Sequence, residues 1–389
     1  MQSDIIVFSI FLIFTGAAVF AGAALYLRQS MLVAYIALGC LAGPWGIGLV
    51  TESTTIQGIG HVGIIFLLYL LGLNLHPQKL LQMLREATRV TLLSSLAFAI
   101  VGYLVALIFG FSTLECFLIG AAMMFSSTII GLKLLPTTAL HHRHVGEVII
   151  SVLLLQDIIA ILILLLLEGL RREALDLTEA ALLVVSLPAL AAFAFLFERH
   201  ILLRIIRRFD TIQEFVFLVA IGWCLGIAQL GHTLGLSYEM GAFIAGVALA
   251  TSPIATFIAE SLKPLRDFFL ITFFFSLGAG FDLSILPAVA APAVALAILM
   301  LVLKPFVFKA LLEWEGEETR LGREIGVRLG QVSEFSLLIA LLAVSGGVIG
   351  AKASYLIQAA TLLTFIGSSY LIMFRYPTPI AVSESLRRD

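Results

Sequence analysis

Charged residues are scarce in this chain of 389 residues: only 12% are Asp, Glu, Lys or Arg, whereas 61% are hydrophobic. The charged share is about half of that in a soluble domain. A soluble chain of this length folds into two or three domains, each with a charged surface. The few charges present do not suffice for such surfaces, which argues against a soluble enzyme. The formal net charge of −2 gives no reason to expect a nucleic-acid partner.

Cysteine is also rare, since Cys40, Cys116 and Cys224 are the only three. Each lies in an apolar run, and the sequence contains no Cys-x-x-Cys pair. We interpret the three as small core residues rather than as a disulfide or metal framework. No pairing of a nucleophile with a base stands out either, so the sequence does not favour an enzyme.

Long apolar runs are abundant. A helix needs about 20 mostly apolar residues to cross a bilayer, and the sequence offers about 13 such segments. The sequence therefore predicts an all-α membrane protein whose first partner is the lipid bilayer. The predicted spans cover 5–27, 31–50, 56–75, 90–111, 114–138, 145–167, 178–198, 212–231, 236–252, 264–283, 285–312, 322–345 and 353–374.

The distribution of Lys and Arg predicts the orientation of these spans. If alternate connections lie on the same side, 18 of the 23 basic residues fall on one side. The other side holds Arg171, Arg172 and Lys352, while Lys304 and Arg328 fall inside spans. Because cytoplasmic connections carry the excess of Lys and Arg, we expect the N-terminus outside and the C-terminus in the cytoplasm.

The two halves of the chain resemble each other at an offset of 208 residues, the separation of Gly72 from Gly280. Gly72-Leu-Asn-Leu75 aligns with Gly280-Phe-Asp-Leu283, and the same offset carries Ser126–Thr128 onto Glu334–Ser336. Six spans, one connector and six more spans would place the second repeat upside down relative to the first. Inverted repeats with interrupted helices are typical of secondary transporters. Any single match is also compatible with chance similarity between Gly- and Leu-rich helices.

Asp157 is the deepest carboxylate, near the middle of the sixth predicted span. A charge at the bilayer centre is costly, and no residue at helical spacing beside Asp157 can neutralise it. Burial therefore favours its protonated form, which suits the exchange of a proton for a cation. The alternative is a packing role, in which Asp157 forms a hydrogen bond to a neighbouring helix.

Two polar interruptions lie within apolar spans, at Ser126–Thr128 and Gln331–Ser336. Small hydroxyl residues favour an unwound stretch, and broken helices present carbonyl groups and half-helix dipoles to a bound ion. Hydroxyl and carbonyl oxygens suit K+ or Na+. For the first interruption, a packing patch of small residues is the alternative. For the second, Glu334 is a candidate carboxylate that is either oriented by Arg328 for transport or paired with it for structure.

Lys304 lies inside the eleventh predicted span, directly before Pro305. An ammonium group at this depth needs a partner. The partner is either Asp157 or the ends of the half-helices where the two broken helices cross. We favour the second, structural role.

These motifs resemble the Kef-type potassium:proton antiporters of the cation:proton antiporter superfamily, from about Tyr35 to Tyr370. The most specific element is Leu155-Gln-Asp-Ile158, followed by Gly39–Gly46, Met240–Gly246 and Gln331–Phe335. The resemblance implies an NhaA-like antiporter fold with two six-helix inverted repeats, broken crossing helices and a homodimer. It also implies that the Gln-Asp pair binds the ion. The predicted cation and proton site is Asp157, Gln156, Ser126, Ser127 and Thr128, and the predicted core charge and crossing residues are Lys304, Glu334, Ser333 and Gln331.

The sequence departs from the Kef-type pattern at three places. Asn74 stands where a glutamate is usual, and Val332-Ser333 replaces two glycines. A nucleotide-binding regulatory domain usually follows the last span, but no Gly-rich phosphate-binding motif follows it here. We expect a transmembrane antiporter domain over 1–375 and a short cytoplasmic tail over 376–389, with no nucleotide-binding domain in this sequence. Either the antiporter is naturally short or the sequence is part of a longer chain. Spans 1–3 and 8–10 would form a scaffold, spans 4–6 and 11–13 a core, and span 7 a linker.

The predicted function is secondary active transport in the cell inner membrane. A monovalent cation, K+ in preference to Na+, would exchange for protons by alternating access, with the Asp157 carboxylate shared by both. Apart from these transported ions, no cofactor is expected. One alternative is a gated, channel-like K+ efflux pathway, which would need no obligate proton. The other is a membrane sensor without transport, although Asp157 and Lys304 argue against it.

Overall fold

The computed structural model describes residues 2–50, 53–74, 77–133, 144–170, 177–209 and 211–378. The regular elements in these ranges are helical. In chain order they are α1 (Gln2–Tyr26), α2 (Met31–Ala42), α3 (Ser53–Asn74), α4 (Pro77–Ile108), α5 (Thr113–Met123), α6 (Thr128–Lys133), α8 (His144–Leu170), α9 (Leu177–Phe197), a π-helical turn η1 (Glu198–Leu202), α10 (Leu203–Arg208), α11 (Gln213–Thr233), α12 (Tyr238–Ala250), α13 (Ala255–Ser261), α14 (Lys263–Ala279), a 3-10 turn η2 (Leu283–Ile285), α15 (Leu286–Trp314), α16 (Thr319–Arg328), α17 (Glu334–Ser345) and α18 (Ala351–Arg375).

Within the described residues, 6 helices are long and apolar enough to cross a membrane. They confirm the prediction of an all-α membrane protein, whereas the count of 13 spans stays a prediction. Their apolar stretches are Val7–Tyr26, Ala87–Ile108, His144–Leu164, Gln213–Thr233, Leu283–Trp314 and Ala351–Arg375. Shorter apolar helices cover Met31–Ala42, Gly60–Leu73, Thr113–Met123, Tyr238–Ala250 and Glu334–Ser345.

Helix α4 differs most from the predicted boundaries, because it begins at Pro77 rather than near residue 90. Charged residues such as Lys79 and Arg85 end the apolar run in the sequence. They do not end the helix, since Lys, Arg, Leu and Gln all have good helix propensity and proline suits a first helical position. Hydropathy located the apolar part of α4 and missed its polar first turns.

The chain divides into two compact units. The first unit comprises Met1–Gly16, Tyr35–Leu81 and Arg172–Gly280, and the second comprises Ala17–Ala34, Gln82–Arg171 and Phe281–Asp389. The first unit contains most of α2, all of α3 and α9–α14. The second contains most of α4, all of α5, α6 and α8, and α15–α18. The scaffold and core roles proposed for such groups of spans stay a prediction.

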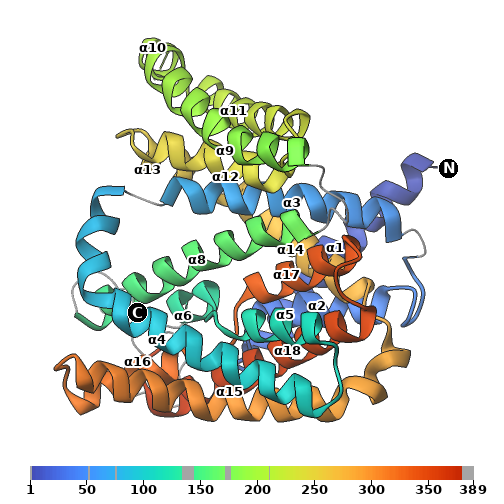
Figure 1. Ribbon diagram of the computed structural model, residues 1–389. Helices are drawn as coiled ribbons and strands as arrows, with labels where there is room; N and C mark the ends of the chain where they lie inside the picture. Colours follow the sequence, from blue (N-terminus) through green and yellow to red (C-terminus); the bar gives the residue numbers. More distant parts are fainter. Residues whose placement is uncertain are drawn as a thin grey trace. The chain divides into compact units, whose positions relative to one another are not determined.

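Close helix crossings hold the first unit together, and Figure 1 shows α12 lying against α3. A Cβ atom added to Gly246 of α12 would lie 2.2 Å from the Tyr69 carbonyl oxygen of α3. Likewise, a Cβ atom on Gly39 of α2 would lie 2.1 Å from the Phe275 carbonyl oxygen of α14. Glycine therefore brings backbone against backbone at both crossings, as small residues do between membrane helices.

Gly246→Ala is expected to lower the thermal unfolding temperature of the purified protein in detergent by several degrees. The new methyl group meets the backbone oxygen of Tyr69, which cannot rotate away, and such overpacking costs about 1–3 kcal/mol. Gly226→Ala is the matched control, because Gly226 lies inside α11 and nothing lies within 4 Å of its added Cβ. Equal unfolding temperatures for the two variants would show that the crossing is looser than described.

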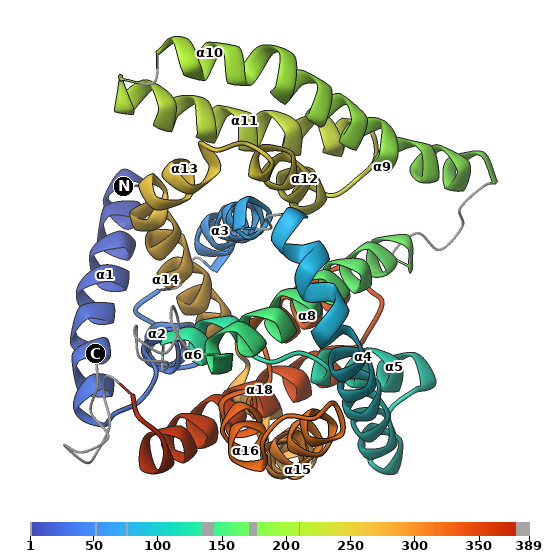
Figure 2. The same ribbon diagram turned by 90° about the vertical axis from the view of Figure 1, so that its left-hand side faces the viewer.

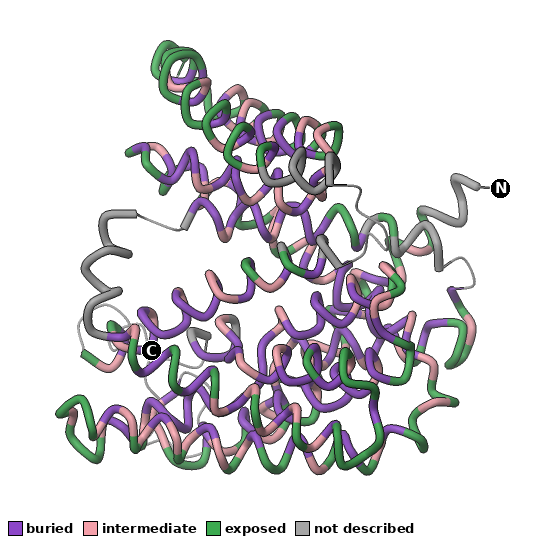
Figure 3. The backbone as a smooth tube through the Cα atoms, in the orientation of Figure 1, coloured by how far each residue is buried: buried purple, intermediate pink, exposed green. Residues whose placement is uncertain are grey.

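Helices α9, η1 and α10 form one continuous rod, with α11 alongside it, as Figure 2 shows. Trp223 of α11 joins three elements: its ring stacks on Phe197 of α9 at 5.6 Å between centroids, and its Nε1 donates to the Ala245 carbonyl of α12 at 3.0 Å. The buried side of this group of helices includes Leu190, Trp223 and Ala245. Figure 3 shows the burial along the backbone, which is higher on α12 than on α10.

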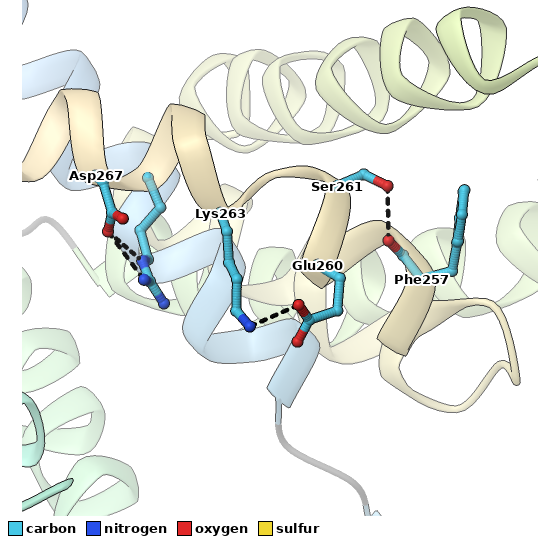
Figure 4. Close-up of polar contacts among 6 residues, drawn as sticks. Phe257, Glu260, Ser261, Lys263 and Asp267 are labelled. Carbon is cyan, nitrogen blue, oxygen red and sulfur yellow. Dashed lines mark hydrogen bonds and ion pairs between the residues drawn. The ribbon is translucent and has the colours of Figure 1, made fainter. Parts of the chain in front are cut away.

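Charged side chains at the turn between α13 and α14 form local pairs (Figure 4). Lys263 pairs with Glu260, and Arg266 donates to Asp267 at 2.9 Å. Ser261 Oγ donates to the Phe257 carbonyl oxygen at 2.8 Å. These ion pairs are largely exposed, so each contributes at most about 1 kcal/mol. They neutralise the basic residues of this connection rather than stabilise the fold.

Candidate functional site

Two helices of the second unit are interrupted at the polar segments that the sequence singled out. Helix α5 ends at Met123 and α6 begins at Thr128, while α16 ends at Arg328 and α17 begins at Glu334. The helix after each break starts with a serine cap. Ser127 Oγ accepts the Ile130 N–H at 3.1 Å, and Ser333 Oγ accepts the Phe335 N–H at 3.1 Å. These side chains satisfy backbone donors that an interrupted helix would otherwise leave without partners.

The two breaks contact each other directly. Ser126 Oγ donates to the Leu329 carbonyl oxygen at 2.8 Å, and Gln331 Nε2 donates to the Ser127 carbonyl oxygen at 3.3 Å. The four residues are buried. Each break thus supplies polar groups that the other needs, which fixes the point at which the two broken helices cross.

Lys304 of α15 lies at this crossing and is fully buried. Its Nζ donates to the carbonyl oxygens of Phe125 and Gln331, one from each break, and lies 5.0 Å from the centre of the Phe98 ring. Its ammonium group therefore meets backbone carbonyls just beyond the C-terminal ends of α5 and α16, where the half-helix dipoles are negative. Among the described residues, no ion pair joins Lys304 to Asp157. The observed contacts are those of the structural alternative.

Asp157 and Gln156 lie on α8 beside the first break. Asp157 is 2% exposed, and Thr128 Oγ1 donates to its Oδ1 at 3.4 Å. Gln156 holds the break itself: its Oε1 accepts the Ser126 N–H at 2.9 Å, and its Nε2 donates to the Met124 carbonyl oxygen at 3.2 Å. The Asp157 carboxylate therefore lies next to a stretch of backbone that its neighbour in sequence fixes in place.

Glu334 lies at the first turn of α17, close enough to Asp157 for the two carboxylates to interact electrostatically. Ser333 Oγ donates to Glu334 Oε2 at 3.5 Å. The interpretation that Arg328 either orients Glu334 for transport or pairs with it for structure stays a prediction. Arg328 donates to Glu324 Oε1 at 2.9 Å, four residues earlier on α16, and also to the Pro377 carbonyl oxygen. An Arg four residues after a Glu meets it on the same helix face.

The structure thus separates the predicted residues into two groups. Thr128 donates a hydrogen bond to Asp157, and Glu334 lies within electrostatic reach of the same carboxylate. Ser126, Ser127, Gln331 and Lys304 build the crossing, and Ser333 caps α17. The hydroxyls of Ser126 and Ser127 form hydrogen bonds to protein groups, and the ion binding expected of these two residues stays a prediction.

Sequence reasoning missed the residues of α18 that support the second break. Thr364 Oγ1 accepts the Val332 N–H at 3.0 Å, and Ser368 Oγ donates to Gln331 Oε1 at 2.7 Å. Thr361, Thr364 and Ser368 recur at helical spacing, and all three are buried. That polar stripe within an apolar span was the signal that would have located them.

Two crossed broken helices with a buried carboxylate and a buried lysine define a class of protein. Irregular backbone at membrane depth occurs where protein buries it or where it lines a water-filled cavity, and discontinuous helices at the binding site are typical of secondary transporters. Comparison with known sequences agrees with this class. The profile of the transmembrane sodium/hydrogen exchangers matches residues 10–375. The chain belongs to this family of cation:proton antiporters and is a multi-pass membrane protein.

The names of similar proteins refer to different transported ions. The chain is 28% identical to the K(+) efflux antiporter 5 of Arabidopsis thaliana, over 95% of this chain and 65% of the relative. It is 29% identical to the glutathione-regulated potassium-efflux system protein KefC of Klebsiella pneumoniae, over 84% of this chain and 54% of the relative. It is also 27% identical to the iron transporter MagA of Paramagnetospirillum magneticum, over 88% of this chain and 80% of the relative. It therefore spans little more than half the length of KefC.

A solved structure shares the fold. The sodium proton antiporter MjNhaP1 from Methanocaldococcus jannaschii superposes with a TM-score of 0.69 over 95% of this chain and 96% of that one. The two sequences are 18% identical. This likeness supports the antiporter fold. At 18% identity it does not indicate which cation the chain would transport.

Proposed function

We propose that this protein exchanges K+ for protons at a single site centred on the Asp157 carboxylate. The observation that carries the proposal is the burial of this carboxylate beside the crossing of two broken helices. With a proton or a cation bound, Asp157 is close to neutral, and either form can face the two sides of the membrane in turn. The bare carboxylate in a low-dielectric layer is costly, which prevents an uncoupled leak.

Thr128 and Gln156 have different tasks in this mechanism. Thr128 Oγ1 already donates to Asp157, and when a cation binds it can rotate to present a lone pair instead. Gln156 keeps the first break in register with α8 through its two hydrogen bonds. The crossing formed by Lys304 holds the broken helices together as one body, which would move relative to a scaffold of the remaining spans.

Gln156→Ala is expected to weaken cation affinity more than maximal exchange rate. Its loss leaves the Ser126 N–H and the Met124 carbonyl without partners and loosens the segment that carries Thr128, but the carboxylate that exchanges the proton remains. Gln358→Ala is the matched control, since Gln358 is another buried glutamine of the second unit and, among the described residues, bonds only to Ser354 on its own helix. Loss of proton coupling with unchanged cation affinity in Gln156→Ala would contradict this role.

The preference for K+ over Na+ rests on the names of the K+ efflux relatives, and the names of the sodium antiporter and the iron transporter provide the competing cargoes. Proteoliposomes with an internal pH-sensitive dye, titrated with KCl, NaCl, LiCl and a ferrous salt, separate these cases. We expect dye responses to KCl at the lowest concentration. A response to Na+ or Fe2+ at a lower concentration than to K+ would overturn the assignment.

The same vesicles distinguish antiport from the two other functions that the sequence allows. A gated K+ pathway would carry K+ without any dye response, and a sensor would carry neither ion. The proposal further includes an inner-membrane location, an outside N-terminus, a cytoplasmic C-terminus and a homodimer. It includes no cofactor other than the transported ions.

A further inference from the structure

A polar cavity of about 570 Å³ lies in the first unit, whereas Asp157 belongs to the second. Its volume is typical of small-molecule sites. One wall is η1 with the start of α10, and the other is the turn between α12 and α13. The lining residues are Glu198, Arg199, Leu203, Arg204, Arg207, Thr251, Ser252 and Pro253.

The backbone of the first wall is unusual. Residues Glu198–Leu202 form a π-helical turn within the continuous rod of α9 and α10 (Figure 2). Such turns are rare, and they frequently mark functional sites. This one carries Glu198 and Arg199, two of the lining residues.

The lining carries three arginines and one carboxylate, which favours an anion. Guanidinium groups match phosphate oxygens in pairs and are the preferred side chains for phosphate recognition. Ser252 adds a neutral donor: it is 6% exposed, and its Oγ accepts the Ile254 N–H at 3.4 Å, which leaves its own proton to donate. Lys263 and Arg266 at the next turn have acidic partners of their own (Figure 4).

Glu198 is unexpected in the lining of an anion site, because an ionised carboxylate repels an anion. It lies beyond the end of α9, is 2% exposed, and its Oε1 is buried without a hydrogen-bond partner. Burial raises the pKa of Glu198 to about 7, and the charges of Arg199 and Arg207 oppose the rise. Of the other titratable groups nearby, Arg204 lines the same cavity, and His200 is exposed on η1, where its Nδ1 lies 2.9 Å from the Leu196 carbonyl oxygen. Glu214 is exposed at the first turn of α11, and the α12–α13 turn has no titratable group.

We propose that this cavity binds the phosphate group of an anionic ligand, with the three lining arginines as counter-charges and Glu198 bound in its protonated form. A protonated carboxyl group donates a hydrogen bond to a phosphate oxygen, whereas an ionised one repels it. The ligand is either the headgroup of an acidic phospholipid or a soluble phosphate. Exposed apolar side chains on the same rod, Leu196 (60%) and Ile201 (44%), favour the lipid, because they can hold its acyl chains.

The source of the phosphate group and the location of its site are tested together on the delipidated protein in detergent. Thermal unfolding and native mass spectrometry are recorded with phosphatidylglycerol, with phosphatidylcholine of the same acyl chains, and with inorganic phosphate. A rise in unfolding temperature and a retained lipid with phosphatidylglycerol alone support the headgroup. A rise with inorganic phosphate at lower concentration assigns the site to a soluble ligand, and no rise with either anion overturns the proposal.

Arg204→Gln/Arg207→Gln should lose at least half of the stabilisation by phosphatidylglycerol. Arg208→Gln is the matched control. Arg208 belongs to the same helix, but its guanidinium group is placed over the Phe209 ring and does not line the cavity. Equal stabilisation of the double variant and the control would overturn the site. If the double variant does not fold, the pH series with Glu198→Gln decides.

The pH dependence tests the role of Glu198 separately. Phosphatidylglycerol is a diester and keeps its charge between pH 6 and 8.5, so a change in its affinity over this range reports a protein group. Affinity should fall several-fold as the pH rises through about 7, because Glu198 then ionises. In Glu198→Gln the affinity should persist at pH 8.5 and no longer vary with pH. A flat wild-type profile would remove Glu198 from the site.

Discussion

Replacing Asp157 with asparagine is expected to reduce cation-dependent proton movement to the level of protein-free liposomes while leaving the fold intact. The amide has the size of the carboxylate and can still accept the hydrogen bond from Thr128 Oγ1. It carries neither the charge that binds a cation nor the proton that is exchanged. Folding should survive, because removal of a buried charge without a salt-bridge partner costs little.

Asp282→Asn is the matched control for this substitution. Asp282 lies before η2 in the second unit, where its Oδ1 accepts the Ser284 N–H at 2.8 Å, a bond that asparagine can also accept. Its exchange rate should equal that of the wild type. Dye-reported exchange in Asp157→Asn at the wild-type rate would rule out the single-carboxylate mechanism.

Lys304→Gln is expected to cause the largest loss of stability among the site variants. The shorter neutral side chain does not reach both the Phe125 and the Gln331 carbonyl oxygens, and each buried acceptor left without a partner costs about 1–3 kcal/mol. Lys309→Gln on the same helix is the control, because Lys309 is partly exposed and, within the described part of the chain, pairs only with Glu313 at 3.6 Å. Differential scanning fluorimetry in detergent should show a lower unfolding temperature for Lys304→Gln than for the control.

The role of Lys304 also determines how charge is balanced during transport. Because Lys304 meets backbone carbonyls, we expect it to keep its proton throughout the cycle, so that one cation exchanges for one proton. Lys304→Gln should then retain some exchange. Wild-type turnover should not change when valinomycin clamps the membrane potential. A clear dependence of the rate on that potential would place Lys304 in the transport site.

Both helix breaks were predictable from the sequence, because a cluster of polar residues in the middle of an apolar span is costly unless protein or water surrounds it. Ser126–Thr128 and Gln331–Ser336 fall at the observed interruptions of α5–α6 and α16–α17. The depth of Asp157 and Lys304 followed from the same reasoning, since charges inside a long apolar run must be buried in protein.

The partners of these residues were not predictable, because they come from distant parts of the chain. Ser126 and Leu329 are 203 residues apart, and no local pattern joins them. Gln156 was expected to bind the ion, which stays a prediction, and the hydrogen bonds of its amide to the backbone at Met124 and Ser126 were not foreseen. Arg328 was considered as a partner of Glu334, and its ion pair with Glu324 on the same helix face was not foreseen.

The central claim, that cation and proton compete for Asp157, is tested most directly by the pH dependence of cation affinity in wild-type proteoliposomes. At each pH, exchange is measured over a series of KCl concentrations with equal pH on both sides at the start. One-for-one competition predicts that the apparent KM for K+ rises about tenfold for each unit of pH below the point where Asp157 protonates, while the maximal rate is retained. An apparent KM that stays constant while the maximal rate falls with acidification would contradict a shared site.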